Sequence, residues 1–337
     1  MKYIDLFAGV GGFRYGIERM CSKNQGQPKG VSTGNKKRQS NKQLNKSNQG
    51  FTCVYSNEWD KYANSVYKRH YGECDSRDIR SVKASEIPAF DLLCGGFPCQ
   101  SFSIAGKRGG FSDTRGTLFF EIARIIKQRQ PRLLLLENVK GLLSHDKGNT
   151  FATIIRTLDE LGYDVQWQVL NSKDFGVPQN RERVFIVGHL RETPRPQVFP
   201  IRKDAKVFDR EDKSNEGRTQ TQLSTTLRGS NIKADNTFIV HNIYGGFKEG
   251  YREFRDVSPT IRTAKGGGHL PALYQDAKIR RLTPIECERL QGFPDNWTEY
   301  GADEEKISDT QRYKMMGNAV TTNVVTAIME KLMGSIK

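Results

Sequence analysis

Three short segments carry side chains that can serve as a nucleophile, an acid and a pair of cations. Cys99 follows Pro98 on a glycine-bearing loop, and a thiol becomes a nucleophile once it is ionised. Glu137 follows a run of leucines, where desolvation raises the pKa of a carboxyl group and favours its protonated form. Arg181 and Arg183 point to one face of an extended chain and can bind phosphate or a substrate carbonyl. The ordinary interpretations, a buried thiol, a solvated carboxylate and surface charge, stay open at this point.

Each of these segments adjoins a predicted strand. The predicted strands are the apolar runs Tyr3–Phe7, Phe51–Tyr55, Asp91–Cys94, Leu133–Leu136, Val165–Leu170 and Val184–Val187. Amphipathic segments, Leu118–Arg129 and Thr150–Leu161, are predicted as crossover helices between strands. This alternation predicts an α/β fold, a mostly parallel sheet with helices on both faces. Ligands of such sheets bind beyond the carboxyl ends of the strands, where we expect the three segments to meet.

The first predicted strand leads into a glycine-rich turn, Ala8–Phe13, where glycines permit a tight bend and close backbone approach to a ligand. The second strand is followed by Glu58, an acid that suits the ribose hydroxyls of an adenosine. Removing residues 22–50 restores the usual spacing of about 20 residues between the glycines and this acid. The glycine fingerprint is incomplete, because Tyr15 stands where a third glycine would fall. The turn fits NAD, FAD or S-adenosylmethionine, and a turn without ligand stays open.

Positive charge is concentrated in two parts of the 337-residue chain, whose net charge is +15. Residues 22–50 hold seven basic residues and no acid among Gly, Ser, Asn and Gln, which predicts a flexible, exposed insertion. Segment 191–278 has 16 Lys and Arg against 11 Asp and Glu. Such an excess favours a polyanionic partner, such as nucleic acid, over simple surface solvation.

The alternation of strands and helices stops after residue 190. Short β-type runs and glycines dominate 191–278, which predicts a second, smaller and irregular β-rich domain. A helical pattern returns at Pro284–Leu290, and an amphipathic stretch, Thr321–Leu332, is predicted to close the fold. The predicted organisation is therefore a domain over 1–190, a second over 191–278, and a segment 279–337 that returns to the first.

The six cysteines form no C-x-x-C pair and have no histidine cluster beside them. We therefore expect no metal site and a reducing compartment. Cys94 lies within an apolar run and is predicted to belong to the core. No run of about 18 apolar residues exists, and the N-terminus lacks a signal-peptide pattern. These features predict a cytoplasmic protein without a membrane span.

Taken in order, the motifs resemble those of the cytosine C5 DNA methyltransferases, especially the small bacterial and phage modification enzymes. The matching segments are Asp5–Phe13, Glu58-Trp59, Asp78-Ile79, Gly96–Ser103 with Gly109–Glu121, Glu137-Asn138-Val139, Gln179–Arg183, Arg281–Pro294 and Gly317–Val320. They span the chain except 22–50 and most of 191–278. The resemblance implies a Rossmann-like, S-adenosylmethionine-dependent methyltransferase fold with a target-recognition domain over 191–278 and a hinge at the start of 279–337.

The resemblance also implies residue roles. Cys99 would add to C6 of a flipped-out cytosine, and a protonated Glu137 would hold N3 of the base. Arg183 would steady the base or the Cys99 region, and Arg181 the DNA backbone. The implied cofactor-binding residues are Phe7, Gly9, Gly12, Glu58, Trp59, Asp78, Ile79, Pro98, Leu118 and Asn318. Trp59 can stack on adenine and Asp78 can accept from its amine, although core packing is the ordinary interpretation of Trp59.

The implied partners are double-stranded DNA, read through its major groove by 191–278, and a cognate restriction endonuclease. The loop Ser101–Gly116 would close over the DNA, and the protein is expected to be a monomer. Three other interpretations stay open. They are a tRNA cytosine-5 methyltransferase on the same fold, a nicotinamide-dependent oxidoreductase, and a DNA-binding protein that has lost catalysis.

Overall fold

The computed structural model describes residues 1–23, 50–98, 118–194, 196–201, 237–241, 251–255, 257–263, 272–275 and 278–334. Cys99, the loop Ser101–Gly116 and nearly all of the predicted insertion lie outside these ranges. The first helix, α1 (Gly12–Lys23), includes the first two residues of the predicted insertion 22–50.

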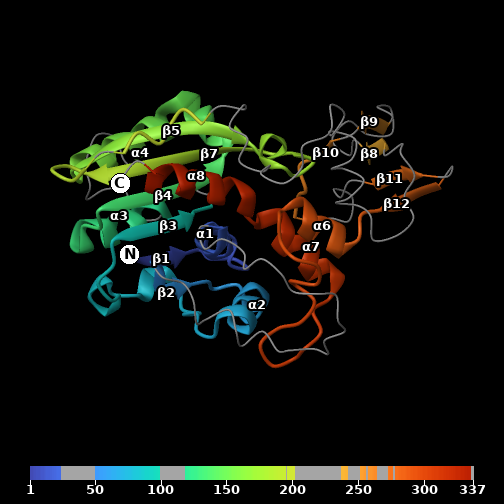
Figure 1. Ribbon diagram of the computed structural model, residues 1–337, viewed down its shortest axis with the longest axis horizontal. Coiled ribbons are helices and arrows are strands. Elements are labelled where there is room, and N and C mark those ends of the chain that lie inside the picture. Colours follow the sequence, from blue (N-terminus) through green and yellow to red (C-terminus); the bar gives the residue numbers. More distant parts are fainter. Residues whose placement is uncertain are drawn as a thin grey trace.

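A six-stranded sheet in the order β2-β1-β3-β4-β7-β5 forms the centre of the molecule (Figure 1). Its strands are β1 (Lys2–Leu6), β2 (Thr52–Asn57), β3 (Leu92–Gly96), β4 (Leu133–Val139), β5 (Tyr163–Asn171) and β7 (Glu182–Leu190). All pairings are parallel except those of β7, which runs antiparallel to β4 and β5. The six predicted strands are therefore confirmed, with somewhat different bounds, as is the mostly parallel sheet.

Helices cover both faces of this sheet, as predicted (Figure 1). Strand residues alternate between the two faces. Tyr3 and Cys94 belong to the core under α1 and α8 (Thr322–Gly334), which confirms the core position of Cys94. Ile4 and Leu93 belong to the core under α3 (Leu118–Arg129) and α4 (Asn149–Glu160). The remaining short elements around the sheet are α2 (Lys61–Tyr71), η2 (Ile79–Ser81), η3 (Ala84–Glu86), η4 (Lys140–Leu143), η5 (His145–Gly148) and η6 (Ser172–Phe175).

A second, antiparallel sheet lies at the right-hand end of the molecule in Figure 1. Its order is β12-β11-β8-β9, with bounds β8 (Thr237–His241), β9 (Tyr251–Arg255), β11 (Ala272–Gln275) and β12 (Lys278–Arg281). The sheet agrees with a smaller, β-rich region. The chain does not leave the large sheet at residue 191, however. Gln166 and Gln168 of β5 donate to the carbonyls of Pro196 and Ile201, each over 3.0 Å, and hold residues 196–201 against the first core.

The C-terminal part returns to the large sheet and connects the two regions (Figure 1). Helix α6 (Pro284–Leu290) begins at the predicted residue, since Thr283 and Glu286 form a capping box and Pro284 occupies the first turn. Helix α7 (Asp309–Asn318) was not predicted. The two-residue strands β6 (Gln179–Asn180) and β10 (Ser258–Pro259) pair in parallel beside these helices.

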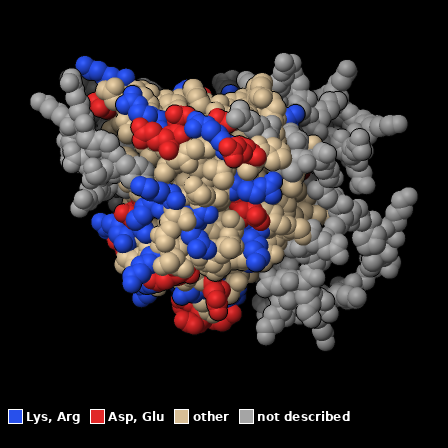
Figure 2. Space-filling model, turned by 90° about the vertical axis from the view of Figure 1, so that its left-hand side faces the viewer, with Lys and Arg blue, Asp and Glu red and all other residues tan. Residues whose placement is uncertain are grey.

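Figure 2 shows the side of the molecule opposite the four-stranded sheet. Basic and acidic side chains intermingle there, so the described residues of this face form no continuous positive surface for a polyanion. No helix within the described ranges has both the length and the apolar character that a membrane span requires.

Candidate active site

A cleft of about 990 Å³ opens where the carboxyl ends of β1 to β4 meet the C-terminal helix α7. Twelve predicted site residues line it: Phe7, Gly9, Glu58, Trp59, Asp78, Ile79, Pro98, Leu118, Glu137, Arg181, Arg183 and Asn318. The fold therefore brings together residues that lie more than 300 positions apart in the chain. Within the described residues, no group of three or more His, Cys, Asp or Glu side chains is arranged to hold a metal ion.

Two predicted site residues do not appear among those that line the cleft. Cys99 lies outside the described residues, although Pro98, directly before it, borders the cleft. Gly12 begins α1 and is not among the residues that line the cleft, so its assignment to the cofactor stays a prediction. A Cβ atom at Gly12 would lie 2.6 Å from Cγ1 of Val320, so this glycine permits close packing of α1 against the chain before α8.

The glycine turn and the end of β2 are joined by hydrogen bonds. Gly9 donates from its backbone to Oε2 of Glu58 over 2.8 Å, and Asp60 donates to Oε1 over 2.7 Å. Burial raises the pKa of Glu58 above its ordinary value, and the two backbone donors oppose that shift. Gly9 has φ +55°, and a Cβ atom there would meet no described atom within 4 Å. Backbone at this turn therefore faces open space in the cleft.

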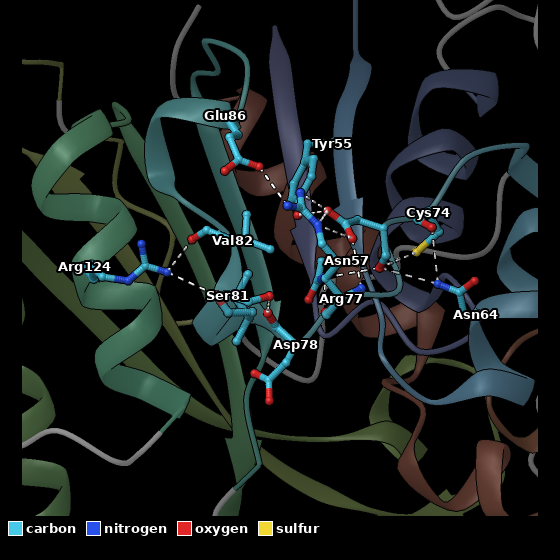
Figure 3. A network of polar contacts seen from close by, with 12 residues as sticks. Tyr55, Asn57, Asn64, Cys74, Arg77, Asp78, Ser81, Val82, Glu86 and Arg124 are labelled. Atoms are coloured by element: carbon cyan, nitrogen blue, oxygen red, sulfur yellow. Dashed lines mark hydrogen bonds and ion pairs between the residues drawn. The ribbon is translucent and has the colours of Figure 1, made fainter.

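A network of amide hydrogen bonds places the segment that carries Asp78 beside the end of β2 (Figure 3). Asn57 donates from Nδ2 to the carbonyls of Asp75 and Arg77 over 3.2 and 2.9 Å. Asn64 of α2, which is buried, donates to the carbonyl of Glu58 over 2.8 Å. The two carboxylates predicted to contact an adenosine are thereby held in a fixed relation.

The same segment is fixed from the other side by α3 (Figure 3). Arg124 donates to the carbonyls of Ile79 and Val82 over 3.1 and 2.8 Å. Asp78 accepts from the backbone N–H of Arg80 over 3.0 Å and pairs with the Arg80 side chain, which lowers the pKa of Asp78. Asp78 is therefore an ionised acceptor at the edge of the cleft.

Trp59 is 66% exposed although its indole ring is large and apolar. Core packing, the ordinary interpretation of this residue, is therefore excluded. The side chain borders the cleft beside Glu58 and offers a flat aromatic surface there. An exposed tryptophan at the rim of an otherwise buried polar site suits a planar ligand such as adenine.

Glu137 and Arg183 form a nearly buried ion pair at the adjoining part of the cleft. Nε of Arg183 lies 3.0 Å from Oε1 of Glu137, and their side chains are 14% and 12% exposed. Burial raises the pKa of Glu137, against the opposing effects of Arg183 and Arg181. The predicted effect of desolvation on this carboxyl group is thus confirmed.

Asn138, the residue after Glu137, anchors the neighbouring loop. Its buried amide donates from Nδ2 to the carbonyl of Phe97 over 2.8 Å, and its Oδ1 accepts from Val139. Phe97 directly precedes Pro98, so the end of β4 fixes the point at which the Cys99 loop leaves β3. Asn138 belongs to the motif Glu137-Asn138-Val139, but the motif does not indicate this contact.

Arg181 is placed differently from its prediction. Its guanidinium donates to the carbonyls of Ile261, Gly317 and Ala319 over 3.1, 3.0 and 2.8 Å, and the residue is only 1% exposed. A buried guanidinium held by three carbonyls does not reach a DNA phosphate. The contact of Arg181 with the DNA backbone stays a prediction, which this placement does not support.

Several cleft residues were missed by sequence reasoning. Lys314 of α7 pairs with Asp60 over 2.5 Å, and both border the cleft. Val10 also borders it, and its carbonyl accepts from Nε1 of Trp297 over 2.9 Å. Asp60 could have been found from its place beside Glu58-Trp59. Lys314 and Trp297 gave no such signal, because Lys314 and its partner Asp60, and Trp297 and its partner Val10, are more than 200 residues apart in the chain.

Comparisons with known proteins agree on one family. The profile of the C-5 cytosine-specific DNA methylase family matches residues 1–334. Type II methyltransferase M.SsoII of Shigella sonnei is 39% identical over 345 residues, covering 99% of this chain and 80% of that protein. Type II methyltransferase M.HhaI of Haemophilus parahaemolyticus is 36% identical over 361 residues, covering 100% and 95%. The Dnmt2 methyltransferase of S. pombe shares the fold, with a TM-score of 0.67 at 16% identity over 98% of each chain.

Proposed function

The chain belongs to the C-5 cytosine-specific DNA methylase family and is a DNA cytosine-5 methyltransferase, and we propose that it methylates a cytosine flipped out of duplex DNA. The methyl donor is S-adenosylmethionine, and the enzyme serves as the modification component of a restriction-modification system. One observation carries the proposal. A single cleft holds both the residues suited to an adenosine and the buried Glu137–Arg183 pair.

The residues at one end of the cleft fit the adenosyl part of the cofactor. Each oxygen of Glu58 accepts one backbone N–H and keeps a lone pair for a ribose hydroxyl. Asp78 is an ionised acceptor for the adenine amine, and Trp59 offers a stacking surface. The open space at Gly9 lets the cofactor approach the backbone. When bound, S-adenosylmethionine supplies an electrophilic methyl group.

The chemistry on the base falls to Cys99 and Glu137. The Cys99 thiolate adds to C6 of cytosine, which makes C5 nucleophilic enough to take the methyl group. Burial raises the pKa of Glu137, and in its protonated form this carboxyl group donates a hydrogen bond to N3 and stabilises the charge that develops on the ring. Loss of the C5 proton to a base then restores the ring double bond and expels the Cys99 thiolate.

The described surroundings support this role for Cys99. Pro98 borders the cleft, and the Asn138 amide fixes the backbone just before it. Arg181 and Arg183 place two cations beside the single carboxyl of Glu137. Excess positive charge of this kind lowers the pKa of a neighbouring thiol and favours the reactive thiolate.

The substrate is duplex DNA, whose sequence is read by the region 191–278. The tRNA alternative has less support, because the relatives with 36–39% identity are Type II methyltransferases. Comparing methyl transfer to duplex DNA and to tRNA tests this choice, and activity confined to tRNA would reject the proposed substrate. A nicotinamide oxidoreductase leaves the family membership unexplained, and a catalytically inactive binder leaves the retained Glu137–Arg183 pair without a role. A cognate endonuclease, a monomeric state, the division at residue 191 and a cytoplasmic location stay predictions.

The decisive experiment substitutes Cys99. Cys99→Ser should lower methyl transfer by roughly 10³-fold or more while duplex binding persists, because a neutral hydroxyl is a far poorer nucleophile. Transfer of tritiated methyl groups measures turnover, and gel shift measures DNA binding. Trapping on DNA that contains 5-fluorocytosine should also require Cys99, since fluorine does not leave as a proton does. Turnover near that of the wild type would reject Cys99 as the nucleophile.

A further inference from the structure

Residues 257–263, which we call the docking segment, connect the four-stranded sheet to the catalytic core. The segment follows β9, and β11 begins after it at Ala272. Between these strands it pairs with β6 through β10. Ser258 donates from its backbone to the carbonyl of Pro178 over 2.9 Å, and the backbone of Ile261 donates to Oε1 of Gln179 over 3.3 Å. The proposed recognition region is thereby attached at a defined point.

The docking segment also lies against the chain that supplies Asn318 to the cofactor cleft. A Cβ atom at Gly317 would fall 2.4 Å from the backbone N of Thr263 and 2.6 Å from the carbonyl carbon of Arg262. Two backbone segments therefore touch here with no room for a side chain between them. Thr263 and Asn318 both border the cleft. A shift of either segment moves the other.

Arg181 joins these two segments. One terminal nitrogen donates to the carbonyl of Ile261 in the docking segment, and the other donates to Gly317 and Ala319, on either side of Asn318. Nε has no hydrogen-bond partner among the described residues, and no described carboxylate forms an ion pair with this side chain. Burying a cation in this way is costly, and three charge-assisted hydrogen bonds offset that cost.

We infer that Arg181 is a positioning residue that holds the docking segment and residues 317–319 in one frame shared by the cofactor and DNA sites. The inference rests on the proposed function. In this role Arg181 links two segments of the protein instead of contacting a DNA phosphate, and its substitution should affect the affinities for both ligands. When these two segments are no longer held together, part of the binding free energy of each ligand is spent on ordering them. The affinities for cofactor and DNA therefore fall together. Saturation with one ligand then restores much of the affinity for the other.

Arg181→Lys tests this inference, because an ammonium group does not reach three carbonyls in two segments. The probes are S-adenosylhomocysteine, by calorimetry, and a duplex that carries the site mapped by bisulfite sequencing, by fluorescence anisotropy. We expect both dissociation constants to rise about tenfold. Excess S-adenosylhomocysteine should recover most of the duplex affinity. The slope of log affinity against log salt should equal that of the wild type.

A phosphate ligand would behave differently, since its loss lowers only DNA affinity and reduces the salt slope by about one. The inference would be overturned by that result. It would also be overturned if only the affinity for S-adenosylhomocysteine fell, or if neither affinity changed. Failure of the wild type to bind either probe would instead reject the proposed function. Arg312→Lys is the matched control. Arg312 is a buried arginine on α7, the helix that carries Gly317, and it is bound to Glu288 away from the cleft lining. Its replacement should therefore lower the melting temperature but leave both affinities unchanged.

A second variant covers the case in which Arg181→Lys does not fold. Gln179→Met removes the bond to Ile261 while Arg181 stays in place, and Gln179 does not border the cleft. Both dissociation constants should again rise, by about threefold. An increase in one of them alone would contradict a shared frame.

Discussion

The two sides of the cleft are held by contacts of different range. On the cofactor side, Glu58 accepts from the glycine turn and Asn57 donates to the segment that carries Asp78, both at the end of β2. On the other side, Arg181 reaches carbonyls 80, 136 and 138 residues away. The contacts of Glu58 and Asn57 belong to one βαβ edge, although Trp297 also reaches the glycine turn from the C-terminal part. The contacts of Arg181 exist only when the whole chain has folded. Local substitutions should therefore affect one ligand on the first side and both ligands on the second.

Glu137 lies between the two sides of the cleft, and its substitution is expected to have the largest effect among the predictions that follow. Glu137→Gln should slow methyl transfer by about 10²- to 10³-fold with little change in cofactor affinity, because an amide cannot supply the acidic proton to N3. Single-turnover rates and calorimetry with S-adenosylhomocysteine measure the two quantities. A loss confined to cofactor affinity would assign Glu137 to the cofactor side and reject its role.

The raised pKa of Glu137 adds a dependence on pH. The protonated carboxyl is the active form, and burial keeps it protonated to a higher pH than an ordinary glutamate. Wild-type single-turnover rates should fall as the pH rises through this pKa. Glu137→Gln has no such group and should lack that decrease.

This difference in range also explains what the sequence could predict. The six strands and four of the helices followed from periodicity, since each depends on neighbouring residues. The twelve cleft residues followed from the resemblance of the ordered motifs to a known family. The contacts of Arg181 and Gly12 could not be predicted in this way. Arg181 ends beside Ile261 and Gly317, and Gly12 beside Val320, only after the C-terminal chain has returned to the sheet. A motif shows that a residue is constrained without showing which contact constrains it.

The glycine turn on the cofactor side is also held by a residue from the C-terminal part of the chain, and this long-range contact can be tested separately. Trp297 donates to Val10, and the ring of His70 stacks on Trp297 at 3.5 Å with an interplanar angle of 6°. Burial lowers the pKa of His70 to about 4, with a smaller contribution from Arg69, against about 6.5 in the unfolded chain. Between these values the unfolded chain binds the proton more readily, so folding stability falls as the pH decreases from about 6.5 to 4.

The loss assigned to His70 is up to about 3 kcal/mol at the acid end of this window. Urea unfolding of the wild type and of His70→Gln at several pH values measures it. The variant should be less stable at neutral pH because stacking is lost, and the difference should shrink as the pH falls. A difference that stays constant with pH would show that His70 does not titrate between the folded and unfolded states as proposed.

Trp59 tests the local side alone. Trp59→Ala should weaken S-adenosylhomocysteine binding about tenfold, because stacking of one base on an aromatic ring contributes about 1–3 kcal/mol. Duplex affinity should change little, in contrast to the Arg181 variant. Trp167→Ala is the matched control, since Trp167 is 47% exposed on β5 and does not border the cleft. Equal effects of the two substitutions would contradict a stacking role for Trp59.

The smallest effect is expected where the chain between α1 and β2 is shortened. The structure moves the proposed boundaries of the insertion to 24–49, because α1 continues to Lys23 and Gly50 accepts from the N-terminal amine beside β2. Six basic residues lie within these limits.

Replacing 24–49 by a short glycine–serine linker should leave the methylated sequence and the cofactor affinity unchanged, since both sides of the cleft keep every described contact. Duplex binding should weaken by roughly three- to tenfold at about 50 mM salt and by less than about twofold at 200 mM, because charges that attract phosphate are screened. A variant that keeps the full length but carries Gln at the six basic positions separates charge from length and should show the same salt dependence. Loss of methyl transfer at every salt concentration in a shortened protein that still folds would instead place this segment within the active site, and the long separation between the glycine turn and Glu58 would then have a catalytic cause.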